Sequence, residues 1–245
     1  VNPILVDFFA LKLCELSLRY GYTSASGGGF IWVGCTATRV SEFTFAAQLG
    51  KFGMAISEKY AGNSEIARAI IVHHAMLAQW TGVHVREYIY QYQRAYKYAI
   101  AGGDQVSCHG GKYGFFDLFH WKLQLFSSSC NLSELRWHLN HSMEECSKGS
   151  SKDVLIMNIS LWRSVLVFQG KTDITMDPEK MMNDPDSNFD EPSFVEDLKS
   201  QSVNSGNPLN WHYSFKMILL FHFGFTEAAS DLGFKIFDNS VNEAV

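Results

Sequence analysis

The chain has 245 residues, 47% of them hydrophobic and 18% charged, which is enough apolar material for a sizeable core and excludes disorder of the whole chain. The net charge is −5 and the lysines and arginines are scattered, so the chain lacks the basic stripe that nucleic-acid binding needs. The five cysteines include no C-x-x-C motif, which predicts reduced thiols in a cytoplasmic protein. They are Cys14, Cys35, Cys108, Cys130 and Cys146.

Helical periodicity begins at once. Residues 4–20 predict a first helix that ends at Gly21, a common helix terminator. A second is expected from Thr23 to Trp32, where glycines 27–29 imply either two closely crossing backbones or a late helix start. Residues 41–60 alternate large apolar residues with alanine and glycine, as expected for tightly packed helices. The next helix is expected at residues 64–80.

Residues 83–101 show the clearest helical spacing, and Gly102-Gly103 ends it. Asp104 is expected to cap a helix that reaches about Phe126. Asn131 and Glu134 have the spacing of a capping box. Leu132, Leu135, Leu139, Met143 and Cys146 follow as a buried stripe. Further helices are expected at 151–168, from Asn207-Pro208, and at 227–238, and strands are hard to place anywhere.

Small or glycine-rich breaks recur near residues 34, 82, 128–131, 170 and 224. Gly34 and Gly82 are 48 residues apart (82 − 34), as are Gly82 and Cys130 (130 − 82). Periods of about 20–50 residues indicate stacked helical repeats. The sequence therefore predicts an all-α array of antiparallel helix pairs, an α-solenoid spanning residues 1–245, with Gly34 and Gly82 in equivalent turns.

Residues 173–206 differ in composition. Nine acidic residues stand between Asp173 and Asp197, against the single Lys180. Four of the five prolines lie in or beside this stretch. We predict a solvated, loosely held insertion, whose replacement at 176–204 by a short linker changes stability by no more than about 1–2 kcal/mol.

Two segments partly match ligand-binding motifs. Gly170-Lys171-Thr172 matches the end of a phosphate-binding loop, but Val165 stands where that loop needs glycine, so we expect a helix end that binds no ATP. Asp184, Asp186, Asn188 and Asp190 resemble the start of a calcium loop. Because the turn and twelfth positions are Phe189 and Val195, we expect a solvated acidic loop instead.

Histidines are the other candidate ligands. His138, His141 and Glu145 share one face of a helix and could hold a metal, although a solvated face is the expectation. The remaining candidates lack matching acidic or cysteine partners and are expected to be packed or surface residues. They are His73, His74, His84, His109 and His120.

No signature of a hydrolase, kinase, zinc protease or dinucleotide-binding enzyme is present, so no catalytic, cofactor or metal residue is assigned. The aromatic stripes at 88–98 and 115–126 are interpreted as core rather than as a ligand pocket. Residues 215–225 are too short a stretch to span a bilayer, and the start lacks the features of a signal peptide. The absence of an initiator methionine and of a final cap leads us to expect a segment of a longer polypeptide.

Three motifs carry a family resemblance: Leu18-Arg19-Tyr20-Gly21 at a helix end, Trp80 before the next helix, and the A-x-x-x-A run from Ala95 to Asp104. With them, the chain resembles the tetratricopeptide-like helical region of large signalling proteins that combine a kinase-like domain, a STAND/AAA-type ATPase, a GAF domain and often a histidine kinase. Nearly the whole chain is covered, except that glycines 27–29 and the segment 173–206 depart from the pattern.

The resemblance implies a non-catalytic scaffold that binds a protein or peptide, or another domain of its own polypeptide. An all-α enzyme and a small-molecule sensor with an aromatic pocket are the alternatives.

Overall fold

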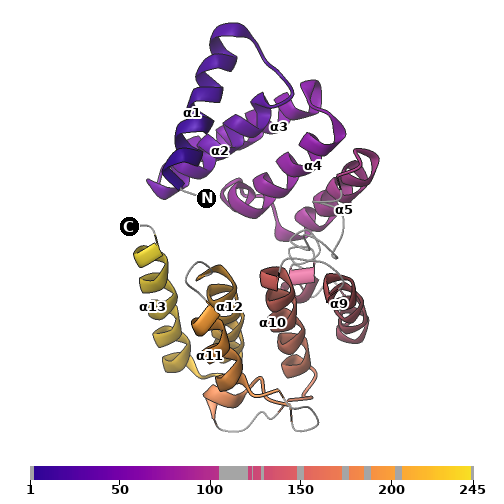
Figure 1. Cartoon of the computed structure of the whole chain (residues 1–245), viewed down its shortest axis with the longest axis vertical. Helices are drawn as coiled ribbons and strands as arrows, with labels where there is room; N and C mark the ends of the chain where they lie inside the picture. The colour runs from indigo at the N-terminus through magenta and orange to yellow at the C-terminus, as the bar shows by residue number, and fades with distance from the viewer. Residues whose placement is uncertain are drawn as a thin grey trace. The chain divides into compact units, whose positions relative to one another are not determined.

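The computed structural model describes residues 3–104, 121–122, 124–127, 130–147, 152–172, 177–184, 189–201 and 206–243 (Figure 1). These residues form helices and turns and contain no strand, which confirms the all-α class. The chain divides into two compact units, and the described residues up to Ser127 belong to the first and those from Cys130 to the second. None of the described helices has the length and apolarity needed to cross a membrane.

The first unit is built from helices that pack on their neighbours in sequence. They are α1 (Pro3–Tyr20), α2 (Ser26–Arg39), α3 (Phe43–Tyr60), α4 (Asn63–Val72) and α5 (Val85–Ala101). A π-helical turn, η1 (His73–Leu77), and a 3-10 turn, η2 (Ala78–Trp80), continue α4. Gly21, Gly82 and Gly103 have φ values of 103°, 73° and 65°, a left-handed conformation that explains why the chain turns at these residues.

Glycines let α2 and α3 approach to backbone contact. A β-carbon on Gly27 would lie 2.5 Å from the carbonyl oxygen of Gly53 and 2.7 Å from the amide nitrogen of Ser57. A β-carbon on Gly53 would lie 2.7 Å from the carbonyl oxygen of Gly27. Of the two expectations for glycines 27–29, the close crossing is therefore correct, and the helix also starts later than Thr23 and runs beyond Trp32 to Arg39.

The repeat register predicted from Gly34 and Gly82 is wrong. Gly82 lies in a turn, whereas Gly34 lies inside α2 and is buried. A β-carbon there would lie 2.8 Å from a methyl carbon of Leu77 and 3.1 Å from the carbonyl oxygen of Ala46. Gly34 is thus a packing residue rather than a helix terminator.

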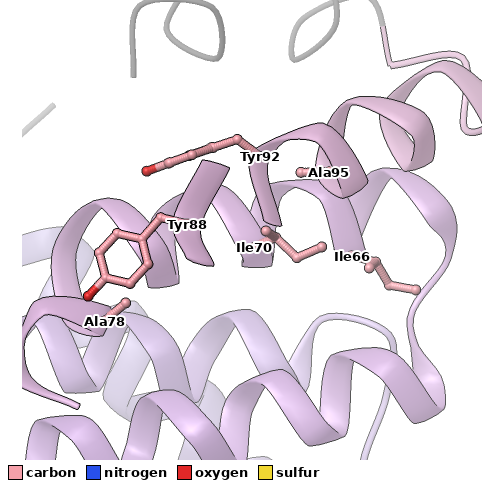
Figure 2. Packing of buried hydrophobic residues seen from close by; sticks show 6 residues of the cluster. All are labelled: Ile66, Ile70, Ala78, Tyr88, Tyr92 and Ala95. Carbon is pink, nitrogen blue, oxygen red and sulfur yellow. The ribbon is translucent and has the colours of Figure 1, made fainter. Parts of the chain in front are cut away.

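Tyrosines of α5 complete the core of the first unit. Figure 2 shows the side chains of Tyr88 and Tyr92 on α5 beside Ile66 and Ile70 on α4. Tyr88 is 6% exposed and Tyr92 1%, so these two members of the aromatic stripe at 88–98 are core, as expected, whereas Tyr90 is exposed. Burial raises the pKa of both phenols, and they stay neutral at physiological pH.

The second unit contains α9 (Leu132–Ser147), α10 (Lys152–Phe168), the 3-10 turn η3 (Pro178–Lys180), α11 (Glu191–Gln201), α12 (Gly206–His222) and α13 (Thr226–Glu243). The helices α9, α10, α12 and α13 pack in that order, and α11 lies against α12 and η3. Asn131 caps α9, because its Oδ1 accepts a hydrogen bond of 2.8 Å from the backbone N–H of Ser133. Gly170 and Gly224 end α10 and α12 with φ values of 65° and 86°.

The prediction of a solvated insertion at 173–206 is wrong for the residues that the structure describes there. Met181 and Met182 are fully buried, and α11 buries Leu198 against Ile156, Leu209 and Tyr213. Apolar burial of this kind offsets the entropy cost of ordering the segment. Replacing 176–204 by a linker would therefore remove part of the core, and we now expect it to abolish cooperative unfolding of the second unit.

Candidate functional site

An open groove lies between η3, α11, α12 and α13, with a volume of about 480 Å³. Each helix contributes residues spaced by three or four positions, so that they share one face. From α11 come Pro192, Val195, Glu196 and Lys199, from α12 Tyr213, Lys216 and Leu220, and from α13 Ala228, Asp231, Leu232 and Lys235. Pro178, Glu179 and Glu191 complete the lining.

Glu191, the first residue of α11, is 1% exposed and connects α11 to α12 and to the turn after η3 at the base of the groove. Its Oε1 accepts from Nζ of Lys216 at 2.7 Å and from Nε2 of His212 at 3.3 Å. Its Oε2 accepts from the backbone N–H of Met182 at 3.3 Å. A buried carboxylate needs such partners because desolvation penalises its charge.

Ser160, His212 and Glu191 form a hydrogen-bonded series. Nδ1 of His212 lies 3.1 Å from Oγ of Ser160, while Nε2 faces Glu191. The order hydroxyl, imidazole, carboxylate is that of a charge-relay triad. Ser160 is 1% exposed, His212 is fully buried, and neither is among the residues that line the groove. A nucleophile must reach its substrate, and this serine is enclosed, so the observed role of the series is to join α10, α12 and α11.

Tyr213 is the unsatisfied group of the groove. The residue is 4% exposed, and its hydroxyl has no hydrogen-bond partner among the described residues. Leaving such a group unpaired costs about 1–3 kcal/mol. The ammonium of Lys235 lies 4.8 Å from the ring centroid, in a cation–π contact.

A second notable site is the π-helical turn after α4. A helix of this kind is often found at functional sites. His74 donates from Nδ1 to the carbonyl of Ile70 at 2.9 Å, and Nδ1 of His73 lies 3.5 Å from the same nitrogen. Burial lowers the pKa of His73 to about 4, with smaller contributions from His74 and Lys51, and burial also lowers that of His74. Both rings are therefore neutral at pH 7, and Nε2 of His73 has no hydrogen-bond partner among the described residues.

Most motifs that the sequence singled out have structural roles. Gly170 and Lys171 direct their backbone N–H groups at the carbonyls of Val167 and Leu166, which is a helix ending rather than a phosphate cradle. Asp184 pairs with Arg163 at 3.5 Å. Oδ2 of Asp190 accepts a hydrogen bond of 3.0 Å from the N–H of Ser193, in the first turn of α11. Asp186 and Asn188 lie outside the described residues.

Apart from the pair His73 and His74, the described histidines do not gather, and the described residues contain no group of three or more side chains placed to hold a metal ion. His138 lies 4.0 Å from Glu134, and His141 stacks on Trp137. His84 caps α5 by accepting from the N–H of Arg86. His109, His120 and the side chain of Glu145 lie outside the described part of the chain.

Cys14 and Cys35 are free and buried, as expected for packed thiols. Burial raises the pKa of each to about 11, so neither is a reactive thiolate at neutral pH.

Comparison with known proteins finds no matching family model and no significant match among curated proteins.

The sequence analysis did not predict the groove or the buried contacts of Glu191. The available signal was the mixture of apolar and charged residues at one face of the last helix, from Ala228 through Asp231 and Leu232 to Lys235. The partners of Glu191 come from different helices, and nothing in the sequence indicated their pairing.

Proposed function

We propose that this chain is a non-catalytic helical interaction module of a multidomain signalling protein, and that it binds a helix of a partner protein or of another domain of its own polypeptide. The observation that carries the proposal is the outer face of α1. Seven large apolar residues there are each at least half exposed. They are Ile4, Leu5, Phe8, Phe9, Leu11, Leu18 and Tyr20.

Large exposed apolar surfaces on proteins mark interaction sites. Charged residues lie on the same face, where Glu15 forms ion pairs with Lys12 at 2.8 Å and with Arg19 at 3.0 Å. Apolar anchors beside charged residues are the composition of a helix-binding surface.

The packing of the first unit supports a helix as the occupant. Successive helices cover one another, the arrangement from which solenoids are built. Among the described elements, α1 packs chiefly on α2, which covers its inner side. A helix on the opposite side would extend the stack in the same way. The buried, free thiols support a cytoplasmic setting.

A photo-crosslinking experiment tests the proposal. A benzoylphenylalanine at position 9 should crosslink to one defined partner in cells, and the same probe at Gln93, an exposed position on α5, should not. The purified partner should then bind the chain at least about tenfold more weakly when Phe9→Asp and Leu18→Asp are introduced together. Equal crosslinking from both positions, or unchanged affinity in the double variant, contradicts the proposal.

A further inference from the structure

The groove in the second unit is large enough to hold a small molecule. Its volume of about 480 Å³ lies within the range of roughly 300–1,000 Å³ that is typical of ligand pockets. Val195, Leu220 and Leu232, from three helices, give the groove an apolar wall, while seven of its fourteen lining residues are charged. A ligand that fills it needs an apolar body.

One part of the groove offers a hydrogen-bond donor that the protein leaves unused. The hydroxyl of Tyr213 is buried and unpaired among the described residues, and the ammonium of Lys235 stands over its ring. Lys235 is itself exposed, so its side chain can turn towards a ligand in the groove without losing buried contacts. A carboxylate placed there accepts a hydrogen bond from the phenol and pairs with the ammonium, two charge-assisted contacts.

The acidic residues of the groove fall into two classes. Glu191 is paired with Lys216 at 2.7 Å and Glu196 with Lys199 at 3.0 Å. Glu179 and Asp231 also line the groove, and in the described part of the chain neither side chain has a cationic partner within ion-pair distance. Lys235 is the one groove lysine besides the paired Lys199 and Lys216. The groove therefore has an excess of negative charge, which disfavours a ligand that carries only a negative charge.

From this combination we infer that the groove binds a small zwitterion with an apolar body, of the class of an aromatic or branched-chain amino acid or a short dipeptide. The ligand carboxylate contacts Tyr213 and Lys235. The ligand ammonium faces Asp231, which lies one helical turn before Lys235 on the same face of α13. This site is independent of the outer face of α1 and takes a different class of ligand.

Thermal unfolding of the full chain tests the inference. Phenylalanine, leucine and the dipeptide Leu-Phe are compared with 3-phenylpropionate, which lacks the amine, and 2-phenylethylamine, which lacks the carboxylate. At least one zwitterion should raise the melting temperature in a dose-dependent way, and each one-charge analogue should need about tenfold more ligand for the same shift. The amino-acid and dipeptide arms identify the source of the zwitterion.

Two groups of results overturn the inference. If no zwitterion shifts the melting temperature at about 10 mM, a concentration well above the Kd of ordinary weak ligands, the groove is not such a site. If 3-phenylpropionate or 2-phenylethylamine acts as well as its parent amino acid, the groove binds a simple anion or cation instead.

Substitutions locate the binding. Tyr213→Phe removes the unpaired hydroxyl, so it should keep or raise the melting temperature of the free protein and weaken ligand binding about tenfold. Tyr90→Phe, at an exposed position of α5, should change neither. Lys235→Gln should weaken binding, and Lys152→Gln, at the start of α10, should not. Unchanged affinity in Tyr213→Phe refutes the assignment even when a zwitterion binds.

Discussion

The two units hold their helices together by different means. In the first unit, glycines bring α2 and α3 into backbone contact beside an apolar cluster that includes Ile31, Ala46 and Leu77. In the second, α10, α11 and α12 meet around buried polar side chains, with Glu191 bonded to both Lys216 and His212. The first arrangement is sensitive to added volume and the second to lost partners, so different substitutions should break them.

The largest effect is expected from Glu191→Ala. The variant leaves Lys216 and His212 without their carboxylate partner, and an uncompensated buried charge costs about 3–5 kcal/mol. Chemical denaturation measures the loss. Glu196→Ala, which removes an exposed ion pair, should cost less than about 0.5 kcal/mol. If the two variants are equally stable, the buried network does not hold α11 in place.

The next largest effect is expected from Gly27→Ala. Its β-carbon would meet the backbone of Gly53 and Ser57, which cannot yield as a flexible side chain can, so the expected loss is about 2–3 kcal/mol. The adjacent Gly28 is the matched control. A β-carbon there meets nothing within 4 Å, so Gly28→Ala should stabilise the helix by about 0.5–1 kcal/mol. Urea denaturation of both variants should give opposite signs, and the same sign in both would contradict the close crossing.

A pH dependence should separate the units further. His73 is neutral in the folded state because burial lowers its pKa to about 4. The unfolded chain takes up a proton on this residue near pH 6.5, so its contribution is complete above pH 6.5 and is lost as the pH falls towards 4. Between pH 7.5 and 5 the loss amounts to about 2 kcal/mol. The unfolding free energy of His73→Gln should lack this dependence, and parallel pH profiles of wild type and variant would disprove it.

The smallest effect is expected from Asn131→Ala at the start of α9. It removes the side-chain acceptor for the N–H of Ser133 and should cost about 1 kcal/mol. Asn140→Ala, at an exposed position within α9, serves as the control and should be neutral or slightly stabilising. Thermal unfolding distinguishes them, provided that both variants unfold in one transition.

Local signals in the sequence predicted the helices and many of their ends. The sequence marks Gly21, Gly103 and Gly170 as helix terminators and Asn131 as a cap, because these effects depend on a few neighbouring residues. The prediction that Gly34 lies in a turn is wrong because a glycine that ends a helix and a glycine that lets another helix approach look alike in sequence. Only the position of α3 and Leu77 distinguishes the two roles.

The prediction of a solvated segment at 173–206 is wrong for a different reason. Its average composition is polar, but the average conceals Met181, Met182 and Leu198, whose burial holds the segment. Glu191 was counted as one more solvated charge, although its partners Lys216 and His212 lie on α12, beyond the reach of any local pattern. The groove depends on the same tertiary pairing, and for that reason it was not predicted.

The contact between Gly27 and Gly53 also limits how the first unit can move. Helices that pack through side chains accommodate conformational change by sliding about 1–2 Å, with the side chains changing rotamer to follow. Where α2 crosses α3, backbone lies close to backbone, because the carbonyl oxygens of Gly27 and Gly53 leave no room for a β-carbon on the opposite helix. A force applied to α2 is therefore transmitted to α3 rather than absorbed. The backbone amide protons at the crossing should exchange with solvent only when the whole unit unfolds.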